Sequence, residues 1–332
     1  MRWVWVSALA LTLGTAACSS DDSSSGSGGS GNAGSGGSGA SGGASGGSGG
    51  QAAPQPGDVE VFAELDSTSE GIAFGQTPSG DAILYVSMNS TDRIVTVSDT
   101  GQVSEFVSVK SPLGMALTKD GDLLVCGKDD STGTEEGVIW KVTPQGDTSV
   151  FIRGDLEAFE TTNFIAVAPD DKIVFSDSSS ERVYVTDAAG QNLAILSSEI
   201  KYPNGMAFSA DGRQLFVASW NQESVWSIPR DPNIGNYGPG AEFLNGVKSV
   251  DGVLVMQAGD LMLITSGDGV VRADATTSQI VADGSNFSVA ANGAFGVGAY
   301  GSEWLYVTNL IGKKISRVLF ADGDTGLELP VR

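Results

Sequence analysis

Histidine is absent from this chain of 332 residues, and cysteine occurs only twice, at Cys18 and Cys126. Without histidine, the chain can form neither a Ser-His-Asp triad nor a histidine-ligated zinc site. Two cysteines are also too few for a disulfide framework. We expect Cys126, in the strand-like run DLLVCGK, to be a buried thiol, because no histidine is present to activate it as a nucleophile.

Basic residues are scarce: 18 Lys and Arg stand against 40 Asp and Glu, a formal net charge of −22. A field of this sign repels nucleic acid and anionic lipid headgroups and attracts cations. We therefore expect no nucleic-acid partner and an affinity for positively charged ligands.

The chain has no apolar run long enough to span a bilayer. Residues 3–13 form a short apolar core after Arg2, which is typical of a cleaved signal peptide, here residues 1–17. The small residues before Cys18 resemble a bacterial lipobox, although Thr15 stands where Leu is usual. We expect a lipidated Cys18 and export to the bacterial cell envelope (periplasm or cell surface), with plain secretion as the alternative.

Apolar side chains are almost missing from the Ser- and Gly-rich stretch that follows Cys18. Such a segment cannot bury enough apolar surface to fold, so residues 18–56 are predicted to be a disordered tether. Contact with the membrane would then be made through the lipid anchor only, and residues 57–332 would form the folded domain.

Sustained helical periodicity is also absent, and a repeat takes its place. Each of six copies contains a short apolar run, a Gly- or Asp-rich turn, a β-branched run, a polar turn and two further strands. The copies recur about every 45 residues. The residues that begin them, which we call the anchors, are Glu70, Leu113, Asn163, Asn204, Asp251 and Asn292.

Four short strands per copy are typical of a β-propeller blade. The sequence therefore predicts an all-β fold, a six-bladed β-propeller with four-stranded antiparallel blades. A strand predicted at 58–65 precedes the first copy. We expect it to complete the sheet of the sixth blade, because this removes a free sheet edge.

The first strand of each propeller blade lines the central channel, so the anchors should form a ring around it. Five of the six carry a side-chain oxygen, and Leu113 is expected to serve packing. Oxygen ligands of this kind suit Ca²⁺ rather than a soft metal. A competing interpretation remains open, because Asn-Gly and Asp-Gly at 204, 251 and 292 are common turn dipeptides.

Two other sets of polar residues recur in the copies, and we expect both to be structural. Asp120, Asp171, Asp211 and Asp260 fall in the predicted hairpin turns. Asn89, Asp177, Asn221 and Asn309 follow the second strand and are expected to satisfy backbone groups of the next turn.

The run PNGMAFSADGRQLFVASW, with SEGIAF and VDGVLV, resembles the SMP-30/gluconolactonase/LRE-like family. This family includes calcium-dependent sugar lactonases and phosphotriesterases of the diisopropyl fluorophosphatase type. The resemblance implies that Glu70, Asn204 and Asp251 bind one catalytic Ca²⁺, with Asp251 as general base or nucleophile. Asn163 matches a further Asn of the family that contributes to the metal or the substrate.

The chain departs from the family pattern around Asn163, where Thr161, Thr162 and Phe164 replace the Arg and Asp that sugar lactonases carry. The resemblance thus extends to the metal site but not to sugar-lactone specificity. We expect a monomeric calcium-dependent hydrolase of lactones or related small-molecule esters, with Asn163 and Asn292 binding substrate. The alternative is a lipid-anchored NHL-like propeller that serves as a non-catalytic binding platform.

Overall fold

The computed structural model describes residues 53–77, 79–154, 158–321 and 323–326. The predicted signal peptide, Cys18 and the tether up to residue 52 lie outside these described residues. Across the part of the chain that is described, no helix is both long and apolar enough to cross a bilayer.

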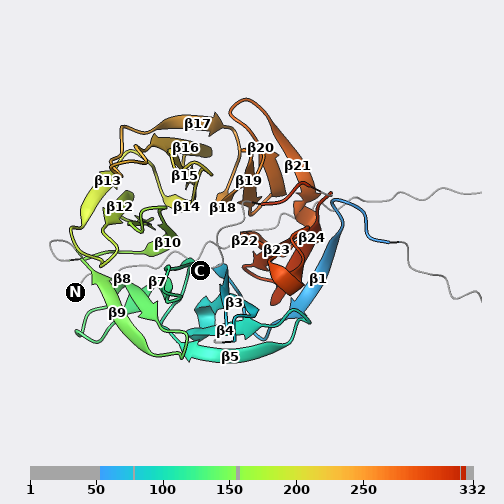
Figure 1. The fold of residues 1–332 in the computed structure, drawn as a ribbon, viewed down its shortest axis with the longest axis horizontal. Coiled ribbons are helices and arrows are strands. Elements are labelled where there is room, and N and C mark those ends of the chain that lie inside the picture. The colour runs from blue at the N-terminus through green and yellow to red at the C-terminus, as the bar shows by residue number, and fades with distance from the viewer. Residues whose placement is uncertain (1–52, 78, 155–157, 322, 327–332) are drawn as a thin grey trace, which may run out of the picture. The chain divides into compact units, whose positions relative to one another are not determined.

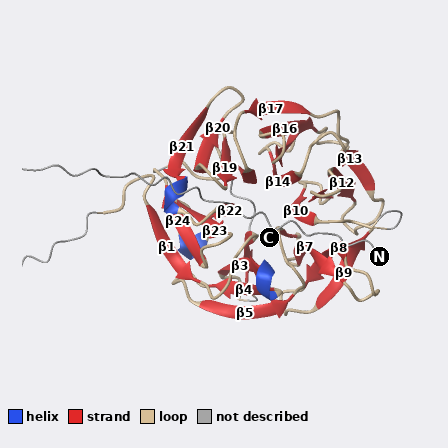
Figure 2. Cartoon of the chain, turned by 180° about the vertical axis from the view of Figure 1, so that it is seen from behind, coloured by secondary structure: helices blue, strands red, loops and turns tan. Residues whose placement is uncertain are grey.

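Six four-stranded antiparallel sheets surround a common axis, as Figures 1 and 2 show, and the predicted six-bladed propeller is confirmed. The strands, innermost first, are as follows: blade one has β2 (Ile72–Gln76), β3 (Ala82–Met88), β4 (Arg93–Val97) and β5 (Val103–Ser108); blade two has β6 (Met115–Leu117), β7 (Leu123–Asp129), β8 (Glu136–Val142) and β9 (Thr148–Arg153); blade three has β10 (Thr162–Val167), β11 (Ile173–Asp177), β12 (Arg182–Thr186) and β13 (Ala194–Ser197); blade four has β14 (Pro203–Phe208), β15 (Gln214–Ser219), β16 (Ser224–Pro229) and β17 (Ala241–Asn245); blade five has β18 (Val250–Val255), β19 (Leu261–Thr265), β20 (Gly269–Ala273) and β21 (Ser278–Asp283); and blade six has β22 (Ala290–Phe295), β23 (Trp304–Asn309), β24 (Lys314–Leu319) and β1 (Val59–Glu64). Short 3-10 turns lie at η1 (Asn89–Thr91), η2 (Gly284–Asn286) and η3 (Gly298–Tyr300).

Strand β1 closes the ring by pairing antiparallel with β24 as the outermost strand of blade six, which confirms the expected closure. The guanidinium of Arg317 on β24 lies 4.1 Å from the ring centroid of Trp304 and forms an ion pair with Glu60 on β1. The strand nearest the N-terminus is thereby fastened to the last blade by main-chain and side-chain contacts, and blade six has no free edge at β24.

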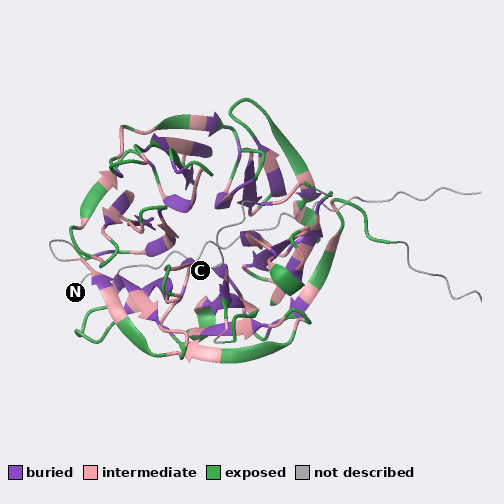
Figure 3. Ribbon diagram, viewed as in Figure 1, coloured by how far each residue is buried: buried purple, intermediate pink, exposed green. Residues whose placement is uncertain are grey.

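Apolar side chains pack between neighbouring blades. Figure 3 shows that the buried segments lie mainly on the inner strands of the blades and the exposed segments on the outermost strands. One cluster joins Phe216 and Leu244 of blade four to Val253 and Leu263 of blade five. Each fully buried side chain of this size contributes roughly 1.5–3 kcal/mol. Cys126 lies in such a cluster as a free, fully buried thiol, and burial raises its pKa well above the usual value. The prediction for this cysteine is confirmed.

Candidate metal and substrate site

The anchors lie at or just before the starts of the innermost strands, and five of them are buried polar residues. The exposed fractions are 8% for Glu70, 8% for Asn163, 4% for Asn204, 4% for Asp251 and 5% for Asn292. Leu113, the anchor of blade two, instead packs partly buried against the hydrophobic cluster around Leu124 and Cys126, as expected for a packing residue.

The Asn-Gly and Asp-Gly pairs at the anchors are not turns. Asn204-Gly205 lies inside β14, and Asp251-Gly252 lies inside β18. None of the glycines that follow these anchors has a positive φ. The turn interpretation is therefore wrong for these dipeptides.

The strand pairing is irregular at the anchors of blades three to six. The register between the first two strands shifts between Pro203 and Met206 in blade four and between Val250 and Gly252 in blade five. Equivalent shifts occur in β10 and β22. Bulges of this kind remove a residue from regular pairing and redirect its side chain, and they are common beside active sites.

The glycine after the anchor allows neighbouring innermost strands to approach closely. A Cβ atom on Gly71 would lie 2.1 Å from the carbonyl oxygen of Leu113, and one on Gly205 would lie 2.2 Å from that of Asp251. Any larger residue would therefore force adjacent blades apart. The Gly in each dipeptide serves blade packing, and the residue before it is left to supply the functional side chain.

Hydroxyl groups on the second strands fix the anchor backbone, a feature that sequence reasoning missed. The Thr308 hydroxyl donates to the Glu70 carbonyl oxygen at 2.6 Å and joins blade six to blade one. The Ser176 hydroxyl donates to the Asn204 carbonyl oxygen at 3.2 Å and joins blade three to blade four. A Ser or Thr near the end of the second strand in the first, third and sixth copies, namely Ser87, Ser176 and Thr308, is the sequence signal that could have revealed them.

Glu70 and Asp251, on blades one and five, are a buried carboxylate pair. Burial and, secondarily, the charge of Asp251 raise the pKa of Glu70 well above its usual value. Burial raises the pKa of Asp251 to about 7, although a hydrogen bond from the Asn204 side chain acts in the opposite direction. Neither pKa is lowered by a Lys or Arg. The pair therefore lacks the countercharge that two buried carboxylates need.

Asn204 Oδ1 is buried and has no hydrogen-bond partner among the described residues. A buried acceptor without a donor is costly, and beside two buried carboxylates it fits a hard cation that prefers oxygen. The described residues contain no group of three or more His, Cys, Asp or Glu side chains that are placed to hold a metal ion. The donor set here consists of two carboxylates supplemented by amide oxygens, which suits Ca²⁺ and not a soft metal.

The two remaining asparagine anchors differ in how their side chains are used. Asn163 Nδ2 donates to the Ser178 hydroxyl at 2.9 Å, which fixes the amide and leaves its Oδ1 for a ligand. Asn292 Oδ1 already accepts the backbone N–H of Gly293 at 2.9 Å. Asn292 therefore has its Nδ2 as the group to offer a substrate.

Tyr202, two residues before Asn204, is a second feature that sequence reasoning missed. It is half-buried, its φ is +49°, and its pKa is raised by burial and by the charges of Asp251 and Glu70. Positive φ is unusual for a bulky residue. The corresponding positions of blades one, two, three and five hold only small residues, namely Thr68, Ser111, Thr161 and Ser249. This contrast is a sequence signal that could have singled out Tyr202.

Two of the outer polar residues of the repeat, Asp177 and Asn309, have the expected role of satisfying backbone groups, whereas Asn89 Oδ1 accepts from the Thr68 hydroxyl at 3.1 Å. The Asp177 carboxylate accepts the backbone N–H groups of Glu160 and Thr161, each at 2.8 Å. Asn309 Oδ1 accepts the N–H of Ser288 at 2.8 Å. These side chains satisfy loop backbone and are not part of the candidate site.

A family model described as the SMP-30/gluconolactonase/LRE-like region matches residues 69–310. The chain belongs to this family. The match begins one residue before Glu70 and includes every anchor. No functionally curated protein matches the sequence.

Several solved structures share the fold of this family member at low sequence identity. A gluconolactonase from Xanthomonas campestris is 19% identical with a TM-score of 0.66, over 79% of this chain and 89% of that one. A protein described as a putative gluconolactonase is 19% identical with a TM-score of 0.67, over 83% and 95%. Regucalcin from Agrobacterium tumefaciens, described as a calcium-binding protein, is 16% identical with a TM-score of 0.63, over 80% and 93%.

Proposed function

We propose that this protein is a calcium-dependent hydrolase of lactones or related esters, with its reaction centre at Glu70, Asn204 and Asp251. The observation that carries the proposal is the pairing of two buried carboxylates, which lack a countercharge, with the unpartnered Oδ1 of Asn204. Membership of a family that includes gluconolactonases supports the reaction class, and the calcium-binding regucalcin neighbour supports the choice of metal.

Each residue of the site has a proposed role that follows from its chemistry. The carboxylates of Glu70 and Asp251 and the Oδ1 of Asn204 would hold the calcium ion. When bound, calcium supplies Lewis acidity toward a carbonyl or phosphoryl oxygen of the substrate. Asp251 removes the proton of the attacking water as general base. Asn163 Oδ1 and Asn292 Nδ2 orient the substrate, and the half-buried phenol of Tyr202 limits access of water.

The residues around Asn163, where this chain lacks the Arg and Asp of sugar lactonases, bear on the expected substrate preference. Phe164, immediately after this anchor, is half-buried and packs against the hydrophobic cluster around Val174 and Met206, so the residues that flank Asn163 carry no charge. We therefore expect lactones and esters with an apolar substituent to be better substrates than sugar lactones.

The test is an activity screen of the purified protein with sugar lactones, alkyl lactones, aryl esters and phosphotriesters, each with added Ca²⁺ or with a chelator. The expected result is hydrolysis of at least one class that chelation abolishes and Ca²⁺ restores. Hydrolysis that persists in the chelator would contradict the calcium-dependent mechanism. A protein that binds Ca²⁺ tightly but hydrolyses no member of the panel would favour the binding platform.

We further propose that the enzyme is held at the bacterial envelope through a lipid on Cys18. The lipobox-like residues and the Ser- and Gly-rich tether support this placement. In cells fed a labelled fatty acid, the protein should carry the label and Cys18→Ser should not. Equal labelling of both would refute the anchor.

A further inference from the structure

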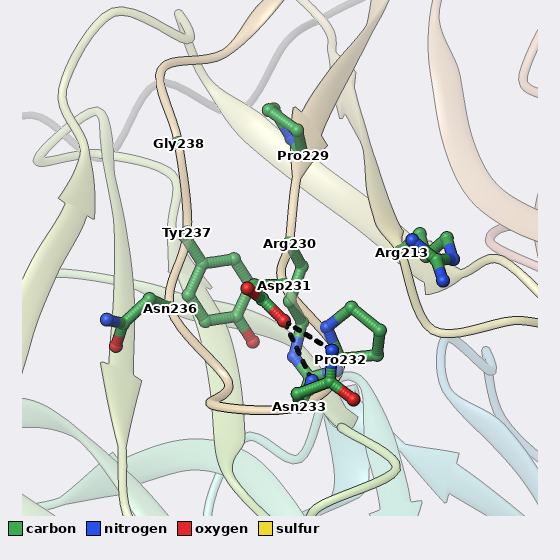
Figure 4. A pocket seen from close by; sticks show the side chains of 9 residues that line it. All are labelled: Arg213, Pro229, Arg230, Asp231, Pro232, Asn233, Asn236, Tyr237 and Gly238. Carbon is green, nitrogen blue, oxygen red and sulfur yellow. Dashed lines mark hydrogen bonds between the residues drawn. The ribbon is translucent and has the colours of Figure 1, made fainter.

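Blade four carries a cavity where residues 230–240 connect β16 to β17. Its volume is about 480 Å³. We call it the blade-four pocket; Figure 4 shows the lining residues Arg213, Pro229, Arg230, Asp231, Pro232, Asn233, Asn236, Tyr237 and Gly238. The corresponding connections in blades one and two, 98–102 and 143–147, are much shorter. The connection lies at the end of the blade opposite the anchors, because successive strands run antiparallel.

The blade-four pocket is held open by hydrogen bonds within its own loop. Asp231 N donates to the Asn236 carbonyl oxygen and Gly238 N to that of Pro229, each at 2.8 Å. Lys172 Nζ, from blade three, donates to the Gly235 carbonyl oxygen at 2.8 Å. The loop is therefore fastened both to itself and to the adjacent blade. Its cavity does not depend on a ligand for its shape.

A buried arginine lies in the wall of the blade-four pocket. The Arg230 side chain is 0% exposed, its Nη2 lies 2.6 Å from Asp170 Oδ1, and its Nη1 donates to the Gly212 carbonyl oxygen at 3.0 Å. Its Nε, however, has no hydrogen-bond partner among the described residues. A buried guanidinium N–H without an acceptor is costly, which favours a further contact with a neighbouring oxygen.

Tyr237 lies beside this arginine. The guanidinium carbon of Arg230 is 5.9 Å from the Tyr237 ring centroid, and Tyr237 Oη is buried. Burial raises the pKa of Tyr237 to about 12, while the charge of Arg230 and a side-chain hydrogen bond with Arg230 act in the opposite direction. The phenol oxygen therefore accepts from the guanidinium, and the O–H of Tyr237 is the buried donor that lacks an acceptor among the described residues of this wall.

Charge at the rim also favours a ligand rich in acceptors. The Arg213 side chain is 65% exposed, and its Nε lies 3.5 Å from Asp211 Oδ2, which is a loose contact. The lining carboxylate, Asp231, is engaged by its own loop, since its Oδ1 accepts from Asn233 N at 2.9 Å and from Asn233 Nδ2 at 3.2 Å. The dashed lines in Figure 4 show these two bonds.

We infer that the blade-four pocket binds the oxyanion of a small molecule, a carboxylate or a phosphate, through Arg213 and Tyr237, with the buried Arg230 holding the phenol of Tyr237 in position. Guanidinium groups donate to both anions in charge-assisted hydrogen bonds. The rings of Pro229 and Pro232 supply an apolar wall for the remainder of the ligand. This site needs no metal and is independent of the hydrolase activity proposed above.

The test is calorimetric titration of the whole protein with benzoate, gluconate and inorganic phosphate, in chelator so that the anchor ring holds no Ca²⁺. The expected result is saturable binding of at least one probe to one site. Tighter binding of a carboxylate would identify an organic acid as the ligand class, and tighter binding of phosphate would identify a phosphate compound. No saturable binding by any of the three probes would overturn the inference.

Variants localise the binding. Arg213→Gln and Tyr237→Phe should each weaken it about tenfold, the effect of losing one charge-assisted or buried hydrogen bond. Lys248→Gln removes an exposed positive charge near the anchor end and should leave the affinity unchanged. Glu70→Gln should also leave it unchanged. Affinity that survives both pocket variants, or that disappears in Glu70→Gln, would show that the anion binds elsewhere. Unfolding temperatures close to that of the parent protein would confirm that the variants fold.

Discussion

The first hairpins of the blades carry carboxylates at two ends that differ in their environment: the anchor end holds Glu70 and Asp251, and the turn end holds Asp120, Asp171, Asp211 and Asp260. At the turn end, Asp260 forms an ion pair with Arg272 at 2.8 Å, and the Ser209 hydroxyl and the N–H of Arg213 lower the pKa of Asp211. At the anchor end, burial raises the pKa values of Glu70 and Asp251. Unlike Asp211, Glu70 and Asp251 have pKa values that burial raises, and no Lys or Arg offsets the burial of either carboxylate.

The comparison shows that the sequence repeat locates the ring of anchors. The candidate site within that ring is identified by buried charged and polar groups that lack partners. A turn aspartate is stabilised by its own backbone and by nearby cations, so its position explains it fully. Two buried carboxylates and an unpartnered amide oxygen have no such explanation within the described chain. The predictions below test whether this difference between the two ends corresponds to a difference in function.

The largest difference is expected between Asp251→Asn and Asp120→Asn. The same chemical change is made at the anchor end in one case and in an exposed hairpin turn in the other. Loss of a general base should reduce kcat by roughly 10²–10⁴-fold, whereas the turn variant should retain activity within about twofold, the small effect usual for surface substitutions. Steady-state kinetics on the best substrate of the panel measure both. Equal losses would remove the distinction between the two ends.

A second large effect is expected in metal affinity. Glu70→Gln removes one of the two anionic ligands and should weaken Ca²⁺ binding on the order of 100-fold, because affinity depends strongly on the number of charged ligands. Glu64→Gln, which makes the same change on the exposed end of β1, is the matched control and should bind as the parent does. Calorimetric titration with Ca²⁺ measures both. An unchanged affinity in Glu70→Gln would place the metal elsewhere.

The raised carboxylate pKa values predict a dependence on pH. Asp251 binds a proton below about pH 7, and the pKa of Glu70 is also raised, so calcium must displace protons from these carboxyl groups as the pH falls. Affinity should therefore fall by up to roughly tenfold for each unit of acidification and each proton displaced. Titrations at pH 8 and pH 6 in buffers of different ionisation enthalpy measure the affinity and the released protons. Affinity that is independent of pH over this range would show that both carboxylates are already ionised without the metal.

The same shifts fix the sign of a stability effect. Without metal, the folded state binds more protons than the unfolded chain between the ordinary carboxylate pKa, about 4, and about 7. The contribution of the pair to stability is therefore present at low pH and lost as the pH rises through this window. Calcium should offset that loss, so its stabilisation against heat should be greater at pH 8 than at pH 5.

The smallest expected effect concerns Tyr202, whose side chain lies near the carboxylate pair but is not a proposed ligand. Tyr202→Phe keeps the ring and should change kcat by less than about threefold, while Tyr202→Ser, which restores the small residue of other blades, should raise KM about tenfold. A change in Ca²⁺ affinity as large as that in Glu70→Gln would instead make Tyr202 part of the metal site.

The fold could be predicted from the sequence because the repeat is explicit, but the register of blade six could not. The Thr308 hydroxyl bonds the backbone of Asn292 as the Ser176 hydroxyl bonds that of Phe164, so Asn292 stands one residue past the anchor position. The sequence also predicted that β1 would complete blade six.

The identity of the close contacts could not be predicted. Gly205 is required by the Asp251 carbonyl oxygen of the next blade, and Thr308 binds the Glu70 carbonyl oxygen across the closure of the ring. These contacts join residues far apart in the chain, and no local pattern specifies them.

The blade-four pocket illustrates the same limit. Nothing in the sequence between Asn204 and Asp251 indicated that Arg230 would be buried beside Tyr237. That arrangement depends on Asp170 and Lys172 of blade three, which hold the loop. The neighbouring blade therefore determines the shape of this loop.

The most direct test of the central claim is a crystal structure of the protein grown with Ca²⁺. We predict a single cation bound by oxygens of Glu70, Asn204 and Asp251 at about 2.3–2.6 Å, the distances usual for calcium. Crystals with saturating Ca²⁺ that show no cation at these three side chains, or that show it held by the turn aspartates at the opposite end, would contradict the account.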